Sequence, residues 1–214
     1  MKKILLVFFP AGATAALCLW YFDNSTAPLG SYFADKAGLA LAFGRLAGIT
    51  GALGVMGQLL IMSRAKWLEP LLGPGRPARP HHTAGLIIPL ALLIHPPLVV
   101  WHHAMLSGNS FMAQYFAVLG WEDVLPAACG EALIIMAVIV SLPFVRRRLK
   151  YKTWHALHLA AYLGLALSIT HQLNLGGDMS ARYPYFHWIW YALLAFTLAN
   201  ALWYRLLRPR IKGE

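Results

Sequence analysis

Six long runs of apolar residues dominate this sequence and restrict the folds open to it. They cover residues 4–22, 37–62, 81–101, 124–145, 153–173 and 185–207. Each run has roughly the 20 residues that an α-helix needs to cross the hydrocarbon core of a bilayer. The sequence therefore predicts an all-α fold, an integral membrane six-helix bundle in which residues 1–214 form a single domain.

The composition also indicates a membrane protein. Charged residues make up 12% of the chain and apolar residues 59%, whereas soluble domains carry about 25% charged residues. The formal net charge is +10, but the basic residues stand in short clusters between the apolar runs. They form no basic, aromatic-interleaved stripe of the kind that follows a phosphate backbone, so we expect no nucleic acid partner.

The first run follows Lys2-Lys3 and is similar in outline to a secretion signal. It is nevertheless long enough to span a membrane, and it ends in Trp20-Tyr21-Phe22. Such aromatic residues are typical of the membrane interface and not of a small-residue cleavage site. We therefore expect a retained first helix.

The distribution of lysine and arginine predicts the orientation. With Lys2 inside and the runs alternating, 15 of the 18 basic residues fall in inner segments: Lys2, Lys3, Arg64, Lys66, Arg76, Arg79, Arg146, Arg147, Arg148, Lys150, Lys152, Arg205, Arg208, Arg210 and Lys212. Lys36 and Arg182 fall outside, and Arg45 lies within the second run. The positive-inside rule then predicts cytoplasmic N- and C-termini, in a bacterial-type inner (plasma) membrane.

Four of the nine histidines form a pattern across two runs. His81 and His95 lie 14 residues apart in the third run, and His158 and His171 lie 13 apart in the fifth. Both helices should run outward, which places one histidine of each near the inner face and one near the outer face, about 20 Å apart. Neutral imidazole is an axial ligand of haem iron. The pattern predicts two stacked b-type haems, each held by one imidazole from each helix.

The two spacings do not match an ideal helix equally well. A step of 14 residues returns to within about 40° of the same face, whereas 13 residues end about 140° away. We expect a kink or a displacement of the haems to absorb the difference, and the sequence His95-Pro96-Pro97 is a candidate kink.

At these residues the chain resembles the ferric reductase-like transmembrane domain, which ferric-chelate reductases, NADPH oxidases and a haem-bearing subunit serving methionine sulfoxide reductase share. The matching segments are residues 81–85 with His95-Pro96, residues 146–158 with His171, and more weakly residues 44–48 and 200–209. The resemblance implies that electrons pass from NAD(P)H through flavin to an inner haem, an outer haem and an acceptor outside, either a ferric chelate or oxygen.

The resemblance also bears on single residues. The family's inner ligand in this helix stands four residues before a glycine, which selects His81 before Gly85; His82 is the alternative. His155 lies one turn before His158 and is interpreted as an interfacial histidine.

The chain departs from the complete enzymes because it stops at Glu214, without a dinucleotide-binding loop. We expect FAD and NAD(P)H to act only through a cytoplasmic flavin reductase domain or subunit. The basic segment 146–152, with Arg64, Arg76 and Arg79, is a candidate docking surface, although the same charges also serve topology.

Two other functions stay open. One is the haem subunit that delivers electrons to a periplasmic methionine sulfoxide reductase, in which, however, an arginine replaces the histidine at position 81. The other is a haem-free six-helix transporter that uses its intramembrane histidines.

Arg45 and Glu131 are charged residues inside apolar runs, where a lone charge is costly. They pair with each other, or Arg45 binds a propionate of the outer haem, and we favour the propionate. Arg45 is therefore counted as cofactor-binding. His102, His103 and His187 are expected at the outer surface, where they bind a metal chelate or, the interpretation we favour, are simply solvated.

Overall fold

The computed structural model describes residues 2–26, 31–73, 78–174 and 184–207. These residues form helices without any strand, so the predicted all-α fold is confirmed for the described part of the chain. The long helices are α1 (Lys2–Ser25), α2 (Lys36–Met62), α4 (Ala78–Ser107), α6 (Val124–Ile139), α8 (Tyr151–Asn174) and α9 (Pro184–Leu202). The short ones are η1 (Lys66–Leu68), α3 (Glu69–Leu72), α5 (Phe111–Leu119), α7 (Pro143–Arg146) and the π-helical turn η3 (Trp203–Leu207).

Each predicted apolar run coincides with a long helix, but the helices differ in how well they suit a bilayer. The stretches Leu6–Ser25, Lys36–Met62 and Arg79–Ser107 are long and apolar enough to cross a membrane. The helix α6 is apolar but has only 16 residues. The helix α8 has 24 residues and is more polar than these stretches, and α9 has only 19 residues. Several apolar helices are therefore compatible with a membrane bundle, and the count of six stays a prediction.

The predicted helix over residues 124–145 is shorter in the structure. The helix α6 ends at Ile139, and Pro143 opens the separate turn α7. Proline lacks an N–H group and its ring clashes with the preceding turn, which favours a helix end before Pro143, although α4 continues through Pro89, Pro96 and Pro97.

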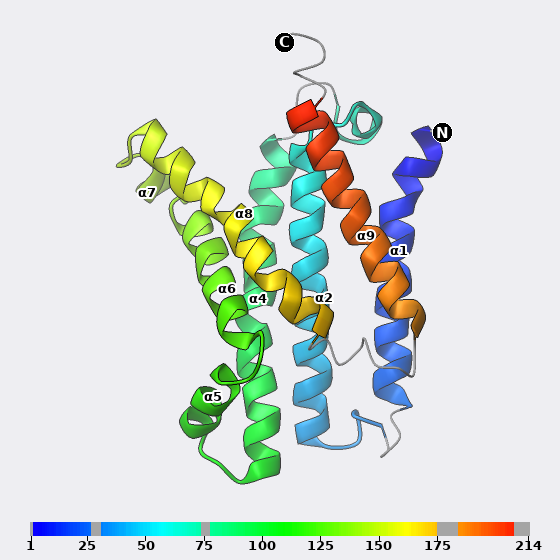
Figure 1. Ribbon diagram of the computed structural model, residues 1–214, viewed down its shortest axis with the longest axis vertical. Coiled ribbons are helices and arrows are strands. Elements are labelled where there is room, and N and C mark those ends of the chain that lie inside the picture. Colours follow the sequence, from blue (N-terminus) through cyan, green and yellow to red (C-terminus); the bar gives the residue numbers. More distant parts are fainter. Residues whose placement is uncertain (1, 27–30, 74–77, 175–183, 208–214) are drawn as a thin grey trace.

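The basic connections lie at one end of the bundle. In Figure 1 the start of α1, the end of α2, the start of α4, the turn α7 and the end of α9 are all at the top, while α5 and the start of α2 are at the bottom. The helices therefore alternate in direction along the chain, as the predicted topology requires.

The helices α2 and α4 pack closely through a row of glycines on α2. Gly44, Gly48, Gly51 and Gly54 face Val99, His95, Leu92 and Ile88 of α4. A Cβ atom added at Gly48 would lie 2.9 Å from Nδ1 of His95. Small residues of this kind let membrane helices approach each other closely.

The helices α6 and α8 form a second close pair. Gly130 of α6 and Gly164 of α8 face each other, and a Cβ atom on either would press against the carbonyl oxygen of the other. In contrast, α4 and α8 do not pack tightly along their lengths. The apolar core lies on the other side of α2, where Met56 and Leu193 are almost fully buried between α1, α2 and α9.

The crossing of α6 and α8 can be tested at Gly164. We expect Gly164→Ala to destabilise the protein by about 1–3 kcal/mol, because the new methyl group meets a backbone oxygen that cannot move aside. Gly57→Ala on α2 is the matched control, since its nearest neighbour is a side-chain carbon of Phe9 at 3.9 Å. The measurement is thermal unfolding of both variants in detergent. Equal melting temperatures for the two variants would contradict the close crossing.

Candidate functional site

The structure brings the four predicted histidines together in the predicted pairs. The ring centres of His81 on α4 and His158 on α8 are 6.0 Å apart, with the planes at 89°. The ring centres of His95 and His171, further along the same helices, are 6.1 Å apart, with the planes at 69°. Each pair links two helices that otherwise pack loosely.

These separations fit an iron atom between two imidazoles. Metal–nitrogen bonds to histidine are about 2 Å long, so two rings bound on opposite sides of one metal have centres about 6 Å apart. The described residues contain no group of three or more His, Cys, Asp or Glu side chains that could hold a bare metal ion. Two imidazoles are, however, the full protein ligand set of a b-type haem, so the residues present fit the predicted cofactor.

Hydrogen bonds determine which ring nitrogen of His81 is available to bind a metal. Its Nδ1 lies 2.5 Å from Oε1 of Gln58 on α2, and Nε2 of Gln58 donates to the carbonyl oxygen of His81 at 3.0 Å. A carbonyl oxygen can only accept, so the amide orientation is fixed and Oε1 faces the ring. The Nδ1 of His81 must therefore carry the proton, which leaves its Nε2 as the nitrogen with a free electron pair.

His95 is held in the same way by a backbone group. Its Nδ1 lies 2.9 Å from the carbonyl oxygen of Gly44, and Gly44 and Gly48 give α4 the room to come this close. Since the carbonyl oxygen accepts, Nδ1 donates and Nε2 is again the free nitrogen.

His158 is anchored to the end of α6. Its Nδ1 lies 3.0 Å from Oγ of Ser141 and 3.3 Å from the carbonyl oxygen of Ala137. The Ser141 hydroxyl donates to that carbonyl oxygen at 2.7 Å and accepts from Nε1 of Trp154 at 3.2 Å. Because the hydroxyl proton of Ser141 is used in the bond to Ala137, its Oγ can only accept a hydrogen bond from Nδ1 of His158. The Trp154 ring also stacks on His158, with ring centres 5.4 Å apart at 16°.

His171 differs from the other three. Its Nδ1 is buried and has no hydrogen-bond partner among the described residues. A buried polar atom without a partner is uncommon in a folded protein. Among the four paired rings, His171 is therefore the one whose Nδ1 the described residues do not hold.

The neighbouring histidines lie elsewhere. His82 is exposed, so the structure turns His81 and not His82 toward His158. His155 is exposed and stacks on Tyr151, with ring centres 5.6 Å apart at 13°, in keeping with the interfacial interpretation.

The expectation of solvated outer histidines is wrong for His102. This residue is only 7% exposed, and its Nδ1 lies 2.8 Å from the carbonyl oxygen of Ala37 on α2. It is a hydrogen-bonded contact between α2 and α4. His103 packs against Trp121, with ring centres 4.8 Å apart.

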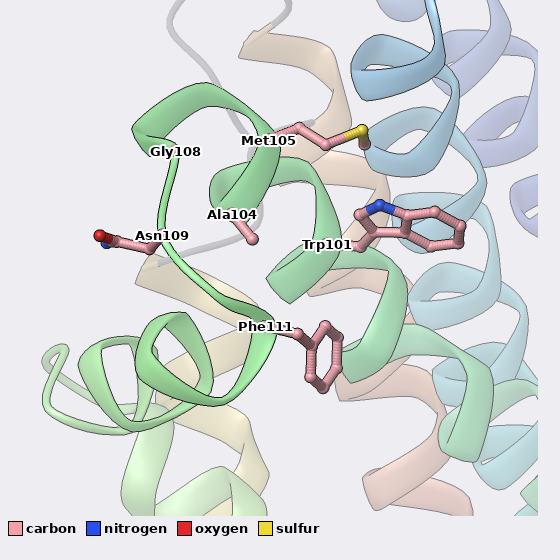
Figure 2. Close-up of a pocket in the computed structure, with 6 residues that line it drawn as sticks. All are labelled: Trp101, Ala104, Met105, Gly108, Asn109 and Phe111. Carbon is pink, nitrogen blue, oxygen red and sulfur yellow. The ribbon is translucent and has the colours of Figure 1, made fainter.

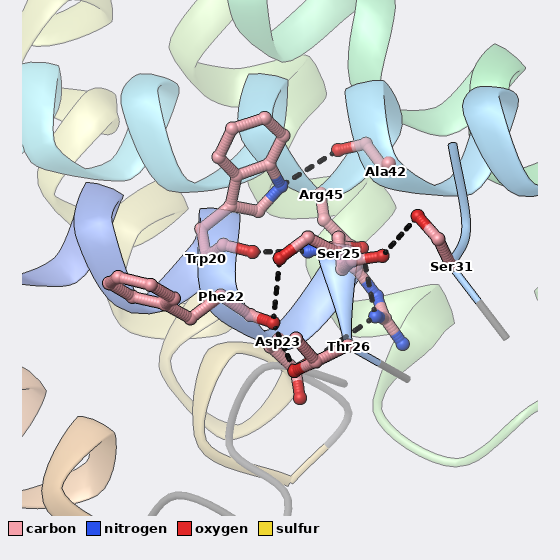
Figure 3. A network of polar contacts seen from close by, with 9 residues as sticks. Trp20, Phe22, Asp23, Ser25, Thr26, Ser31, Ala42 and Arg45 are labelled. Atoms are coloured by element: carbon pink, nitrogen blue, oxygen red, sulfur yellow. Dashed lines mark hydrogen bonds and ion pairs between the residues drawn. The ribbon is translucent and has the colours of Figure 1, made fainter. Parts of the chain in front are cut away.

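Arg45 pairs with Asp23 and not with Glu131. Its guanidinium is 3.5 Å from the carboxylate of Asp23 and 3.3 Å from Oδ1 of Asn24, both near the end of α1, and it lies over the ring of Tyr32 at 5.1 Å. Figure 3 shows this network between α1 and α2. Pairing of Arg45 with Glu131 was therefore wrong, because the carboxylate comes from the end of the neighbouring helix. A role toward a propionate stays a prediction.

A shallow hollow of about 370 Å³ lies where α4 meets α5 (Figure 2). It is lined by Trp101, Ala104, Met105, Gly108, Asn109 and Phe111. None of these six side chains titrates, so the hollow contributes no acid or base.

Helices of membrane-spanning length and histidines paired across two of them define a multi-pass helical membrane protein. The family model for the ferric reductase like transmembrane component matches residues 47–169, more than half of the chain. The chain therefore belongs to the ferric reductase-like transmembrane family, and this membership makes it the membrane component of an oxidoreductase. No curated protein and no solved structure matches it.

Three residues at the paired rings were not among the predicted site residues. Gln58 is a lone amide in an apolar run, Ser141 lies two residues before Pro143, and Trp154 lies one turn before His158. The available signal was polarity: an amide or hydroxyl inside an apolar run needs a partner. The sequence does not say on which helix that partner lies.

The pair Arg45–Asp23 gives a prediction on stability. The two side chains are 16% and 11% exposed, and removing one member of such a pair costs on the order of 3 kcal/mol. We expect Arg45→Leu to lower the free energy of unfolding accordingly, and Arg45→Leu/Asp23→Leu to recover most of the loss. Arg147→Leu, at an exposed position, is the control and should change it by less than about 0.5 kcal/mol. Additive effects of the two single changes in denaturant titrations would contradict the pairing.

Proposed function

We propose that this protein carries two b-type haems and moves electrons outward across a bacterial-type inner membrane. In this proposal His81 and His158 bind the inner haem, and His95 and His171 bind the outer haem. Electrons come from a cytoplasmic flavin reductase domain or subunit, which itself uses FAD and NAD(P)H. They leave to an acceptor outside, a ferric chelate or oxygen. The observation that carries the proposal is the two imidazole pairs, each with ring centres about 6 Å apart.

The cofactor would supply one-electron chemistry, and the chain supplies ligation, spacing and dielectric. The steps along α4 and α8 separate the two ligand levels by about 20 Å. Gln58, Gly44 and Ser141 hold three of the rings so that Nε2 is free to bind. Electron transfer of this kind needs no acid or base from the protein.

The arrangement of charge supports the direction. The connections that hold the basic clusters lie at one end of the bundle (Figure 1), close in sequence to His81 and His158. By the positive-inside rule this end faces the cytoplasm, with both termini. In this orientation His81 on α4 and His158 on α8 are the ligands on the side of the electron donor.

We also keep Arg45 as a ligand of the outer haem's propionate. It follows Gly44, the residue whose carbonyl oxygen bonds His95, so it lies beside the outer ligand level.

The ligand assignment predicts haem content and its dependence on single residues. We expect about two haems per chain and a Soret band in the purified protein. His158→Ala should lose the inner haem and His95→Ala the outer one, because each removes one of two iron ligands. His82→Ala is the matched control and should retain both. Pyridine haemochrome assays and dithionite-reduced spectra measure the content; a haem-free protein would favour the transporter instead.

The basic end predicts a salt-dependent encounter with the flavin donor. Arg146 lies over the ring of Trp154 at 4.5 Å, so the exposed Arg147 and Arg148 are the better residues to change. We expect Arg147→Glu/Arg148→Glu to slow haem reduction by a flavin reductase several-fold at low salt and little at high salt, because charges steer the encounter.

Lys36→Glu, at the opposite end of the bundle, is the control for this experiment and should leave the rate unchanged. Topology and haem content are measured for each variant. If the double variant is reduced at the wild-type rate at both salt concentrations, the basic residues serve topology alone.

A further inference from the structure

Gln58 makes both of its hydrogen bonds with one residue. It lies on α2 within the stretch Gly57-Gln58-Leu59, and its amide reaches across to the first turns of α4. There it donates to the backbone carbonyl of His81 and accepts at the ring of the same residue. A Cβ atom added at Gly85, one turn further along α4, would lie 3.4 Å from Nε2 of Gln58. The amide therefore lies over a single turn of α4.

This double contact defines both the position and the protonation of the ring. The bond to the backbone fixes the amide relative to α4, and the bond to Nδ1 fixes the rotation of the imidazole relative to the amide. An acceptor at Nδ1 also retains the proton there, so that Nε2 keeps its electron pair. Among the four paired rings, His81 is held by a side-chain amide, whereas Gly44 holds His95 with its backbone.

The chemical consequence concerns electron density on the ring. A hydrogen bond accepted from the far nitrogen makes a metal-bound imidazole more basic and a stronger electron donor. A stronger donor stabilises ferric iron more than ferrous iron, which lowers the reduction potential. Removing the acceptor should do the opposite, and a negatively charged acceptor should lower the potential further.

We propose that Gln58 is a positioning residue that presents Nε2 of His81 and holds the reduction potential of the inner haem low. The proposal rests on the proposed function, since it requires a haem between His81 and His158. In this role Gln58 touches neither iron nor porphyrin and acts only through His81. It would set the midpoint of the one-electron reduction of the inner haem relative to that of the outer one.

The test is a redox titration of the two haems in detergent-purified protein. We expect Gln58→Leu to move one of the two components to a more positive potential, by a change of about tenfold in its reduction equilibrium, which is about 59 mV for one electron. Gln58→Glu should move the same component in the negative direction. Gln114→Leu is the matched control, because Gln114 is a buried glutamine on α5 whose partners are Ser107 and Asn109. It should move neither component.

A second measurement distinguishes a change in electron donation by His81 from a loss of packing between α2 and α4. The low-spin ferric signal in electron paramagnetic resonance reports the ligand field of each haem, and we expect a changed signal for one haem only. If Gln58→Leu loses the inner haem, Gln58→Glu decides: retention with a more negative potential supports the proposal. Loss of the inner haem from both variants, equal shifts of both components, or unmoved potentials with full haem content would each overturn it.

Failure of the proposed function looks different from failure of this inference. A wild-type protein without haem, or with one haem per chain, refutes the two-haem assignment before any variant is made. Two haems in the wild type, with potentials that do not depend on position 58, leave the proposed function intact and refute the role of Gln58 alone.

Discussion

Each paired histidine brings two ring nitrogens into the bundle, and only one of them can be left free for a cofactor. In lipid an unsatisfied N–H group is costly, so the other nitrogen is expected to donate to an acceptor within the protein, although Nδ1 of His171 finds none among the described residues. For three of the rings the acceptor is on an adjacent helix or turn: Gln58 and Gly44 on α2, and the end of α6 near Ser141. The arrangement of the helices follows from this requirement. The helices α4 and α8 carry the paired rings, and α2 and α6 lie behind them and hold those rings in place.

The glycines make this arrangement possible. A backbone carbonyl reaches a ring on the next helix only if the two helices are unusually close, and Gly44 and Gly48 provide that approach between α2 and α4. Gly130 and Gly164 do the same between α6 and α8. The looser contact between α4 and α8 is bridged by the rings. A group bound there would join the two helix pairs, so ligand binding and bundle stability should be coupled.

The sequence predicts which histidines face each other but not what holds them. Spacing along two helices was enough to pair His81 with His158 and His95 with His171, because the steps of 14 and 13 residues are similar in length and both helices run the same way. The 13-residue step, which ends about 140° from its starting face in an ideal helix, did not prevent the pairing of His95 with His171. Contacts between helices cannot be predicted from spacing in this way. Gln58 and His81 are 23 residues apart, and no local pattern links them. The same holds for Arg45: the sequence singles out charges inside apolar runs, whereas its partner Asp23 lies near the end of α1.

The early end of α6 links the position of Pro143 to the orientation of His158. Because Pro143 interrupts the run, the last turn of α6 tightens, and the N–H of Ser141 bonds Val138 instead of Ala137. The carbonyl oxygen of Ala137 is thereby released from the helix ladder, as carbonyls at helix C-termini are. It then accepts from the Ser141 hydroxyl and lies within reach of Nδ1 of His158. A helix continuing to residue 145 would have used that oxygen internally. The break in α6 therefore contributes to the orientation of His158 through the Ala137 carbonyl oxygen.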